Sequence, residues 1–234
     1  AAAVRDLLEI QEGMVFSRRA VMDSRVAIEK KLADVGYAFA NVNPIPNPNR
    51  DTKVVDIAFV IDPGPKVYVR RINIAGNTAT QDVVIRREMR QMEGALYSNQ
   101  KIERSRERID RLGFFEDVSI GVVPVSGATD EVDLNVDVAE SKTGNVLLGI
   151  GYSDEERGFI QGEVSRNNLF GTGKAIEISV DHSKIRQAYQ LEYVNPYYTA
   201  EGISRSMFAR QKIVDAGVGA AAGYVSNSST LGLR

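Results

Sequence analysis

The sequence predicts two tandem α+β modules of order β-α-α-β-β, followed by an antiparallel β-sheet with one apolar and one polar face. Three observations support this fold class. Sequence patterns recur within residues 1–143 at offsets of 77 and 81. Composition changes near residue 143, and beyond it lie 12 of the 20 glycines and six of the nine tyrosines. Strands in residues 144–198 then alternate strictly between apolar and polar side chains.

Composition excludes several classes of function. The chain has 234 residues, a net charge of −2, no cysteine and a single histidine. Disulfides, thiolate sites and multi-histidine metal sites are therefore excluded, and we expect no cofactor and no nucleic-acid partner. His182 has Asp181 and Ser183 as sequence neighbours, but these lie on alternating faces of a strand without an oxyanion-hole motif. We therefore predict that the protein is not an enzyme and has no catalytic residues.

The repeat defines the two modules. Ser17 and Ser98, each expected to cap a helix, lie 81 residues apart, and Gly36 and Gly113 lie 77 apart. The first copy is expected to hold a helix over 18–35 and strands near 37–43 and 53–61. Its opening strand is missing, and the first ten residues read as a helix entered part-way, so we expect this module to be truncated at its start.

The second copy shows every element. A strand is expected over 66–75, and residues 78–81 form a capping-box pattern that opens a helix reaching about Met92. Buried positions of that helix are predicted at Ile85, Met89 and Met92. A second helix follows Ser98, and its inward residues are expected to be Ile102, Ile109 and Leu112. Two alternating strands then cover 118–122 and 131–138.

The second part of the chain is predicted to be all β. Four strands alternate within 144–198, and two weaker ones are expected near 203–210 and 217–225. The Gly171-x-Gly173 pattern precedes a strand rather than a helix, so it indicates a hairpin turn and not a phosphate loop. A soluble sandwich and a membrane barrel both show such two-faced strands. About six strands cannot close a barrel, because the smallest single-chain barrels use about eight, so we expect a larger sheet.

Five segments carry a resemblance to a known family. They are DVVIRREMRQMEGALYS (82–98), RIDRLGFFEDV (108–118), TGNVLLGIGYS (143–153), NNLFGTGKA (167–175) and VNPYYTAEGIS (194–204). Together with the tandem modules, they resemble the BamA superfamily of outer-membrane proteins, whose modules are called POTRA domains. The resemblance implies a POTRA domain over 1–64 (truncated, similar to the fourth), another over 65–141 (similar to the fifth), and about six strands of a transmembrane β-barrel over 142–234.

The resemblance also implies a function and a location. It implies the central component of the machinery that folds and inserts β-barrel proteins into the outer membrane of a Gram-negative bacterium without ATP. The POTRA domains would lie in the periplasm. A two-partner-type secretion pore, with POTRA domains and a barrel that passes a secreted protein, is the alternative. A soluble β scaffold fits less well, since four tyrosines and four two-faced strands point to a membrane.

The resemblance assigns expected partners to particular surfaces. Arg86, Arg87, Glu88 and Arg90 are expected to line the exposed side of a helix, as a solvated charged face or as a docking site for a BamD-like assembly lipoprotein. Charge reversal at Glu88 would then weaken complex assembly without unfolding the module. The strand with Val118, Ile120 and Val122 is a candidate edge for unfolded outer-membrane clients, which periplasmic chaperones would deliver.

Two further sets of residues concern the lipid bilayer. The first predicted barrel strand would form one side of an openable seam, since glycines contribute no packing there. Its residues are Val146, Leu148, Gly149, Gly151 and Tyr152. Four tyrosines are expected at the membrane–water interface, where amphipathic rings are favoured. They are Tyr189, Tyr193, Tyr197 and Tyr198.

Overall fold

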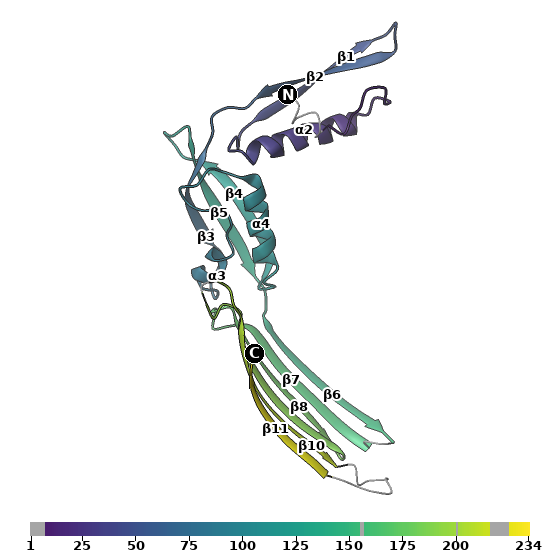
Figure 1. Ribbon diagram of the computed structural model, residues 1–234, viewed down its shortest axis with the longest axis vertical. Helices are drawn as coiled ribbons and strands as arrows, with labels where there is room; N and C mark the ends of the chain where they lie inside the picture. The colour runs from purple at the N-terminus through teal and green to yellow at the C-terminus, as the bar shows by residue number, and fades with distance from the viewer. Residues whose placement is uncertain (1–7, 155–156, 200, 216–224) are drawn as a thin grey trace. The chain divides into compact units, whose positions relative to one another are not determined.

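The computed structural model describes residues 8–154, 157–199, 201–215 and 225–234 (Figure 1). The chain divides into two compact units. The first comprises Ala1–Gly76, Arg86–Leu112 and Asp117–Val138; the second comprises Asn77–Ile85, Gly113–Glu116 and Ala139–Arg234. Two short segments of the second module thus cluster with the large β-sheet rather than with the rest of their own module.

The first module contains α2 (Arg18–Ala33), β1 (Asn41–Asn49) and β2 (Val54–Asp62). Ser17 caps α2 as expected, because its hydroxyl accepts a hydrogen bond from the N–H of Ala20. The strand expected at 37–43 was placed too early, and β1 instead runs through three prolines. Pro44, Pro46 and Pro48 alternate along this strand of a two-stranded sheet. Alternation turns all three missing N–H groups away from β2, which an edge strand tolerates.

The second module contains β3 (Tyr68–Ala75), α3 (Asp82–Arg86), α4 (Asn99–Asp110), β4 (Phe115–Pro124) and β5 (Glu131–Glu140). Its sheet has the order β3-β5-β4, and β3 runs parallel to the central β5. Alternate residues of β5 are buried, in agreement with the expected pattern. They are Val132, Leu134, Val136 and Val138. As predicted, Ile102 and Ile109 of α4 are also buried.

The first helix of this module is much shorter than expected. It ends at Arg86, and Met92, which was expected inside, is 57% exposed. The backbone beyond the helix finds other partners: the N–H of Arg90 donates to Ser105 Oγ at 2.8 Å, and the N–H of Gly94 donates to the carbonyl of Val69 at 2.7 Å. These tertiary bonds replace the intrahelical ones, so the chain leaves the helix.

The expected capping box at residues 78–81 does not form. The hydroxyl of Thr78 donates to the carboxylate of Glu140 at 2.7 Å, and the N–H of Gln81 donates to the carbonyl of Gly171 at 2.9 Å. A carboxylate from the end of β5 therefore takes the place of the local cap. This is favourable because a charged acceptor forms a stronger hydrogen bond than a hydroxyl does.

The two modules repeat one buried serine. Ser24 Oγ donates to the carbonyl of Ala20 and accepts from the N–H of Glu9. In the same way, Ser105 Oγ donates to the carbonyl of Lys101 and accepts from the N–H of Arg90. Both serines are fully buried. The 81-residue offset therefore extends to hydrogen bonds between the longer helix and the segment before it.

The large sheet is antiparallel throughout, in the order β11-β10-β9-β8-β7-β6. Its strands are β6 (Gly144–Ser153), β7 (Arg157–Leu169), β8 (Lys174–Ser183), β9 (Arg186–Asn195), β10 (Arg205–Asp215) and β11 (Val225–Leu233). The last strand was expected near 217–225; residues 216–224 lie outside the described residues, and β11 begins at Val225. No helix among the described residues is long and apolar enough to cross a membrane.

The buried hydrophobic core of the described residues lies in the two modules. Among the described residues, every buried apolar side chain falls between Val21 and Val138. The large sheet instead leaves apolar side chains open, with Leu148, Ile150 and Leu231 each more than 80% exposed. A contiguous apolar sheet face is not stable in water, so this face requires another apolar medium or partner.

Candidate functional site

The first strand of the large sheet combines an exposed apolar face with a free edge. Val146, Leu148, Ile150 and Tyr152 of β6 are between 66% and 84% exposed. β6 pairs with β7 over ten residues, and in the described chain nothing pairs with its other side. Its backbone N–H and C=O groups on that side are therefore available to another strand. Their role as a seam stays a prediction.

Glycine at both outer strands accommodates an aromatic ring from the neighbouring strand. Gly151 of β6 lies opposite Phe159, and a Cβ on it would lie 2.2 Å from the ring. At the other edge, Gly232 of β11 lies opposite Phe208 with the same 2.2 Å approach. Each ring therefore covers a glycine, an arrangement known to stabilise glycine in strands. Gly149, by contrast, meets only ordinary contacts from Gln161.

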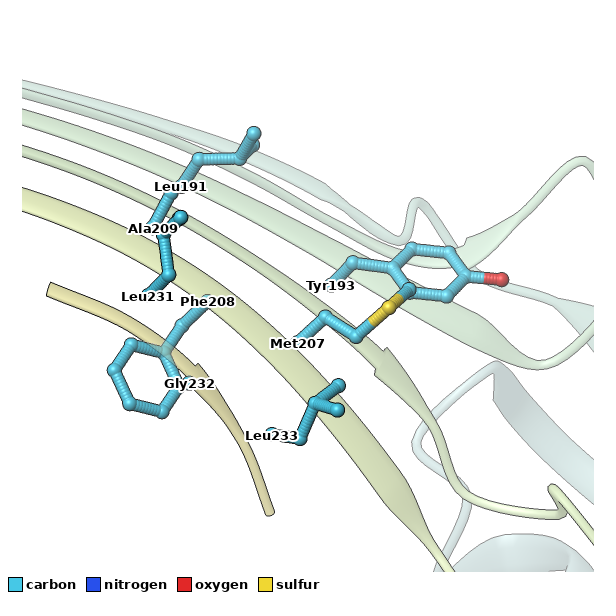
Figure 2. Close-up of a pocket in the computed structure, with 8 residues that line it drawn as sticks. All are labelled: Leu191, Tyr193, Met207, Phe208, Ala209, Leu231, Gly232 and Leu233. Atoms are coloured by element: carbon cyan, nitrogen blue, oxygen red, sulfur yellow. The ribbon is translucent and has the colours of Figure 1, made fainter.

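An open apolar groove lies on the outward face of β9, β10 and β11 (Figure 2). Leu191, Met207 and Leu231 point from its strands in the same direction as Tyr193 and Leu233. The opposite face carries the polar side chains beside the rings of Phe159 and Phe208: Arg210 Nε donates to Gln190 Oε1 at 2.9 Å, and Glu177 lies opposite Glu192. One face thus suits hydrocarbon and the other suits water.

The four tyrosines expected at an interface fall into two groups. Tyr197 and Tyr198 lie in the turn between β9 and β10, where Arg205 stacks 4.7 Å from the centre of the Tyr198 ring. Tyr193 lies near the end of β9 that leads into this turn. Tyr189 lies four residues back, about 13 Å along the strand at 3.3 Å per residue. An interfacial role for them stays a prediction.

The residues expected to dock a partner do not share one exposed face. Arg86 and Arg90 are exposed, but the side chain of Glu88 is only 4% exposed. Its carboxylate lies 2.6 Å from Arg108 Nη2 and 3.9 Å from Arg87 Nε. The expectation that Glu88 is a surface residue was therefore wrong. The helix ends two residues earlier, and the turn that follows places Glu88 among arginine side chains.

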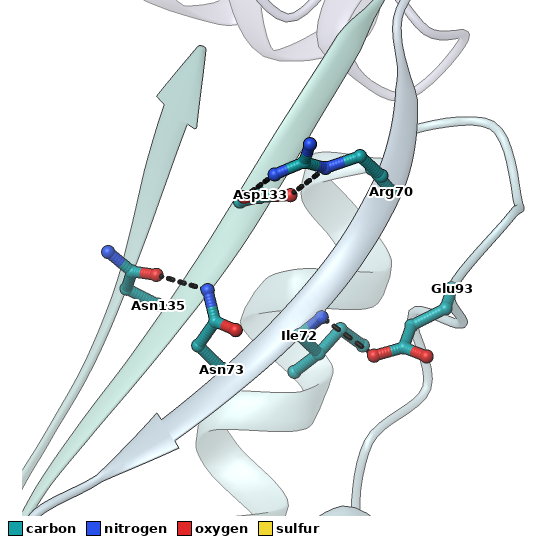
Figure 3. Close-up of polar contacts among 6 residues, drawn as sticks. All are labelled: Arg70, Ile72, Asn73, Glu93, Asp133 and Asn135. Carbon is teal, nitrogen blue, oxygen red and sulfur yellow. Dashed lines mark hydrogen bonds and ion pairs between the residues drawn. The ribbon is translucent and has the colours of Figure 1, made fainter. Parts of the chain in front are cut away.

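The edge of β3 is largely covered. Residues 94–97 bond to its first half: the N–H of Val69 donates to the carbonyl of Ala95 at 3.0 Å, and that of Tyr97 donates to the carbonyl of Val67. Further along, the N–H of Ile72 donates to Glu93 at 2.8 Å (Figure 3). Arg86 donates to the carbonyl of Ile72 at 3.4 Å and pairs with Glu93.

On the solvent-facing side of this three-stranded sheet, side chains of β3 form hydrogen bonds with side chains of β5. Arg70 donates two hydrogen bonds to Asp133, at 2.6 and 2.9 Å, and Asn73 donates to Asn135 at 3.0 Å (Figure 3). The hydrogen bond with Arg70 lowers the pKa of Asp133.

β4 lies at the other edge of this sheet, and no further strand pairs with it in the described part of the chain. Val118 of β4 is buried, while Ile120 and Val122 are half-buried. β4 is thus the open edge of this module.

Glu140, at the end of β5, binds the segment that precedes α3. Its carboxylate accepts from the Thr78 hydroxyl at 2.7 Å and from the N–H groups of Ala79 and Thr80 at 2.9 and 2.6 Å. Partial burial raises the pKa of this carboxyl, but the hydrogen bonds from Thr80, Thr78 and Ala79 outweigh burial and lower the pKa to about 2. Glu140 is therefore ionised at neutral pH and holds three donors.

Neither Glu140 nor Asn168, which bond to different atoms of Thr80, was predicted from the sequence. Asn168 was visible only as part of the NNLFGTG turn, and its side chain is buried against Thr80, 88 residues earlier in the chain. Only a contact of that separation reveals its role. The one available signal was the pairing of asparagine with two glycines in a turn, which indicates left-handed backbone.

Comparisons with known proteins agree with this architecture. A family model described as POTRA, surface antigen variable number repeat, matches residues 1–64 and 67–141. The outer membrane protein assembly factor BamA of Neisseria meningitidis serogroup B is 38% identical over 203 residues, covering 87% of this chain and 26% of that protein. BamA of Nitratidesulfovibrio vulgaris is 37% identical over 164 residues, covering 70% of this chain and 21% of that protein. The chain spans about a quarter of the length of these relatives.

Two solved structures are similar to this chain. The crystal structure of BamA from Haemophilus ducreyi lacking POTRA domains 1–3 superposes with a TM-score of 0.86 at 29% identity, over 97% of this chain and 43% of that one. CdiB from Escherichia coli has a TM-score of 0.52 at 16% identity, over all of this chain and 44% of that one, which indicates a shared fold only.

Proposed function

This chain belongs to the POTRA family, and we propose that it is part of a BamA-type factor that folds and inserts β-barrel proteins into the outer membrane. The observation that carries the proposal is the large sheet, which has an exposed apolar face and a polar face and directly follows two POTRA modules. In this proposal the apolar face of the sheet contacts lipid and the polar face lines the inside of the barrel, while the POTRA modules lie in the periplasm.

The proposed mechanism needs no catalytic residue and no ATP. Client strands pair with an openable edge at β6, where the backbone groups along Val146, Leu148 and Tyr152 template a new strand. Gly149 and Gly151 contribute no side-chain packing across that edge. Free energy comes from the client itself, because pairing its strands in lipid satisfies backbone groups that would otherwise stay unpaired.

The direct test reconstitutes the full-length protein with its lipoprotein partners in liposomes without nucleotide. An unfolded client barrel should become protease-resistant and membrane-embedded faster than in empty liposomes. A secretion pore would instead move a soluble passenger across the bilayer and leave the client's folding rate unchanged. That second result would contradict the proposal.

We expect unfolded clients to bind β4 rather than β3. A photo-crosslinking residue at Ser119, exposed on β4, should capture an unfolded client segment, because this edge has backbone groups open to another strand. The same residue at Asn73, exposed on the covered strand β3, should capture at least several-fold less. The measurement is crosslinked client on a gel. Equal capture at the two positions would contradict the preference.

A lipoprotein partner of the BamD type is proposed to dock on the arginines around α3. Arg90→Glu should weaken capture of that partner by about tenfold, since a reversed charge in an exposed docking face costs about 1.4 kcal/mol or more. Because Arg90 is exposed, the thermal stability of the module should not change. The control is Arg104→Glu on α4, which should leave capture intact. Unchanged capture in both variants would remove Arg90 from the docking site.

A further inference from the structure

Three segments that lie far apart in the sequence meet within the second compact unit. They are residues 77–81 before α3, Glu140 at the end of β5, and the turn 168–173 between β7 and β8. Glu140 is bonded to Thr78, Ala79 and Thr80 as described above. Thr80 then carries the connection onward, because its Oγ1 accepts a hydrogen bond from Asn168 Nδ2 at 2.7 Å.

Both polar atoms of the Asn168 side-chain amide form hydrogen bonds at this junction. Nδ2 donates to Thr80, and Oδ1 accepts from the N–H of Gly173 at 2.8 Å. Both Asn168 and Thr80 are buried, at 7% and 3% exposure. Asn168 adopts a φ of +55°, which asparagine tolerates better than most residues. The amide therefore fixes the turn internally and joins it to residues 77–81.

Gly171 brings the two backbones into direct contact. Its carbonyl accepts from the N–H of Gln81 at 2.9 Å, and a Cβ at Gly171 would lie 1.9 Å from the carbonyl oxygen of Ala79. No side chain fits in that space. This backbone contact therefore fixes the β7–β8 turn against residues 77–81.

We propose that Glu140, Thr80 and Asn168 form a latch that makes the start of α3 and the β7–β8 hairpin move as one body. Arg86, at the C-terminal end of the same helix, belongs to the proposed docking face, and β7 is the strand that pairs with β6 along its whole length. A displacement of α3 by a docked partner would thereby reach the strand beside the seam. This consequence rests on the proposed function; the latch itself does not.

The test measures the latch without using assembly activity. Because the chain has no cysteine, nitroxide labels can be placed on cysteines at Val83 and Phe170, which are 60% and 80% exposed. Pulsed electron paramagnetic resonance on the full-length protein in proteoliposomes should give one narrow distance distribution. Asn168→Asp removes the Nδ2 donor but keeps the acceptor for Gly173 and should broaden the distribution at least twofold. Asn167→Asp, on an exposed neighbour, should leave it unchanged.

A second variant approaches the latch from the other side. Thr80→Val keeps the side-chain volume but removes the hydroxyl that accepts from Asn168, and it should broaden the distribution as Asn168→Asp does. A narrow, unchanged distribution in either variant, with the barrel folded by heat-modifiable gel migration, overturns the proposal. If the unmodified protein failed to assemble client barrels, that result would contradict the proposed function. The distance measurement would still test the latch.

Discussion

Replacing Gly76 with alanine is expected to destabilise the second POTRA module by about 3 kcal/mol or more. Gly76 directly follows β3 and has a φ of +87°, and an added Cβ would lie 1.9 Å from the carbonyl oxygen of Val138. The left-handed backbone alone costs an alanine about 1–2 kcal/mol. The close approach adds to this, because Val138 lies in β5 and Gly76 directly follows its partner strand β3, so the sheet holds the backbone on both sides.

The matched control is Gly127→Ala. Gly127 has almost the same φ, +88°, but no atom lies within 4 Å of the position its Cβ would take. Gly127→Ala should lower the stability only by the cost of placing alanine in left-handed backbone, about 1 kcal/mol. Hydrogen exchange of the β3 and β5 amides in the full-length protein separates the two. Exchange should rise by about 100-fold for Gly76→Ala and by about tenfold or less for Gly127→Ala. Equal effects would show that the close approach relaxes at no cost.

Replacing Glu88 with glutamine is expected to cost about 3–5 kcal/mol, as does breaking other buried ion pairs. The side chain is 4% exposed and accepts from Arg108 at 2.6 Å, with Arg87 on its other side. Without the carboxylate, the Arg87 and Arg108 side chains, which are 19% and 33% exposed, would lose the anion that both of them contact. Glu88→Lys should be worse still, because it places a third cation there.

Glu103→Gln is the control for this change. Glu103 pairs with Arg106 at 3.2 Å, but both side chains are about half exposed, so the same substitution should cost less than about 1 kcal/mol. Thermal unfolding and limited proteolysis of the two variants give the comparison. If Glu88→Gln were as stable as Glu103→Gln, the arginine pair would have to be hydrated. Loss of partner binding in a Glu88 variant therefore does not by itself identify a docking contact.

The sequence determined most of the fold, since periodicity and repeats are local properties. Strict alternation in 144–198 predicted the two-faced sheet, and the 81-residue offset placed the helix caps at Ser17 and Ser98. The strand β1 was not predicted over its full length because it contains three prolines. Their missing N–H groups are tolerated only because they point away from β2, which the sequence does not reveal. The early end of α3 was likewise invisible, since its carbonyl and N–H partners lie in β3 and α4.

The functional surfaces likewise include some features that local sequence patterns predict and others that depend on tertiary contacts. The modules, the apolar sheet face and the glycines of β6 could be predicted, because each follows from residue type and spacing. Three features appear only in the folded chain: Glu88 is buried, β3 is covered while β4 is open, and Glu140 and Asn168 meet at Thr80. These features depend on contacts between residues up to 88 positions apart, and a hydrogen bond at that separation leaves no periodic trace in the sequence.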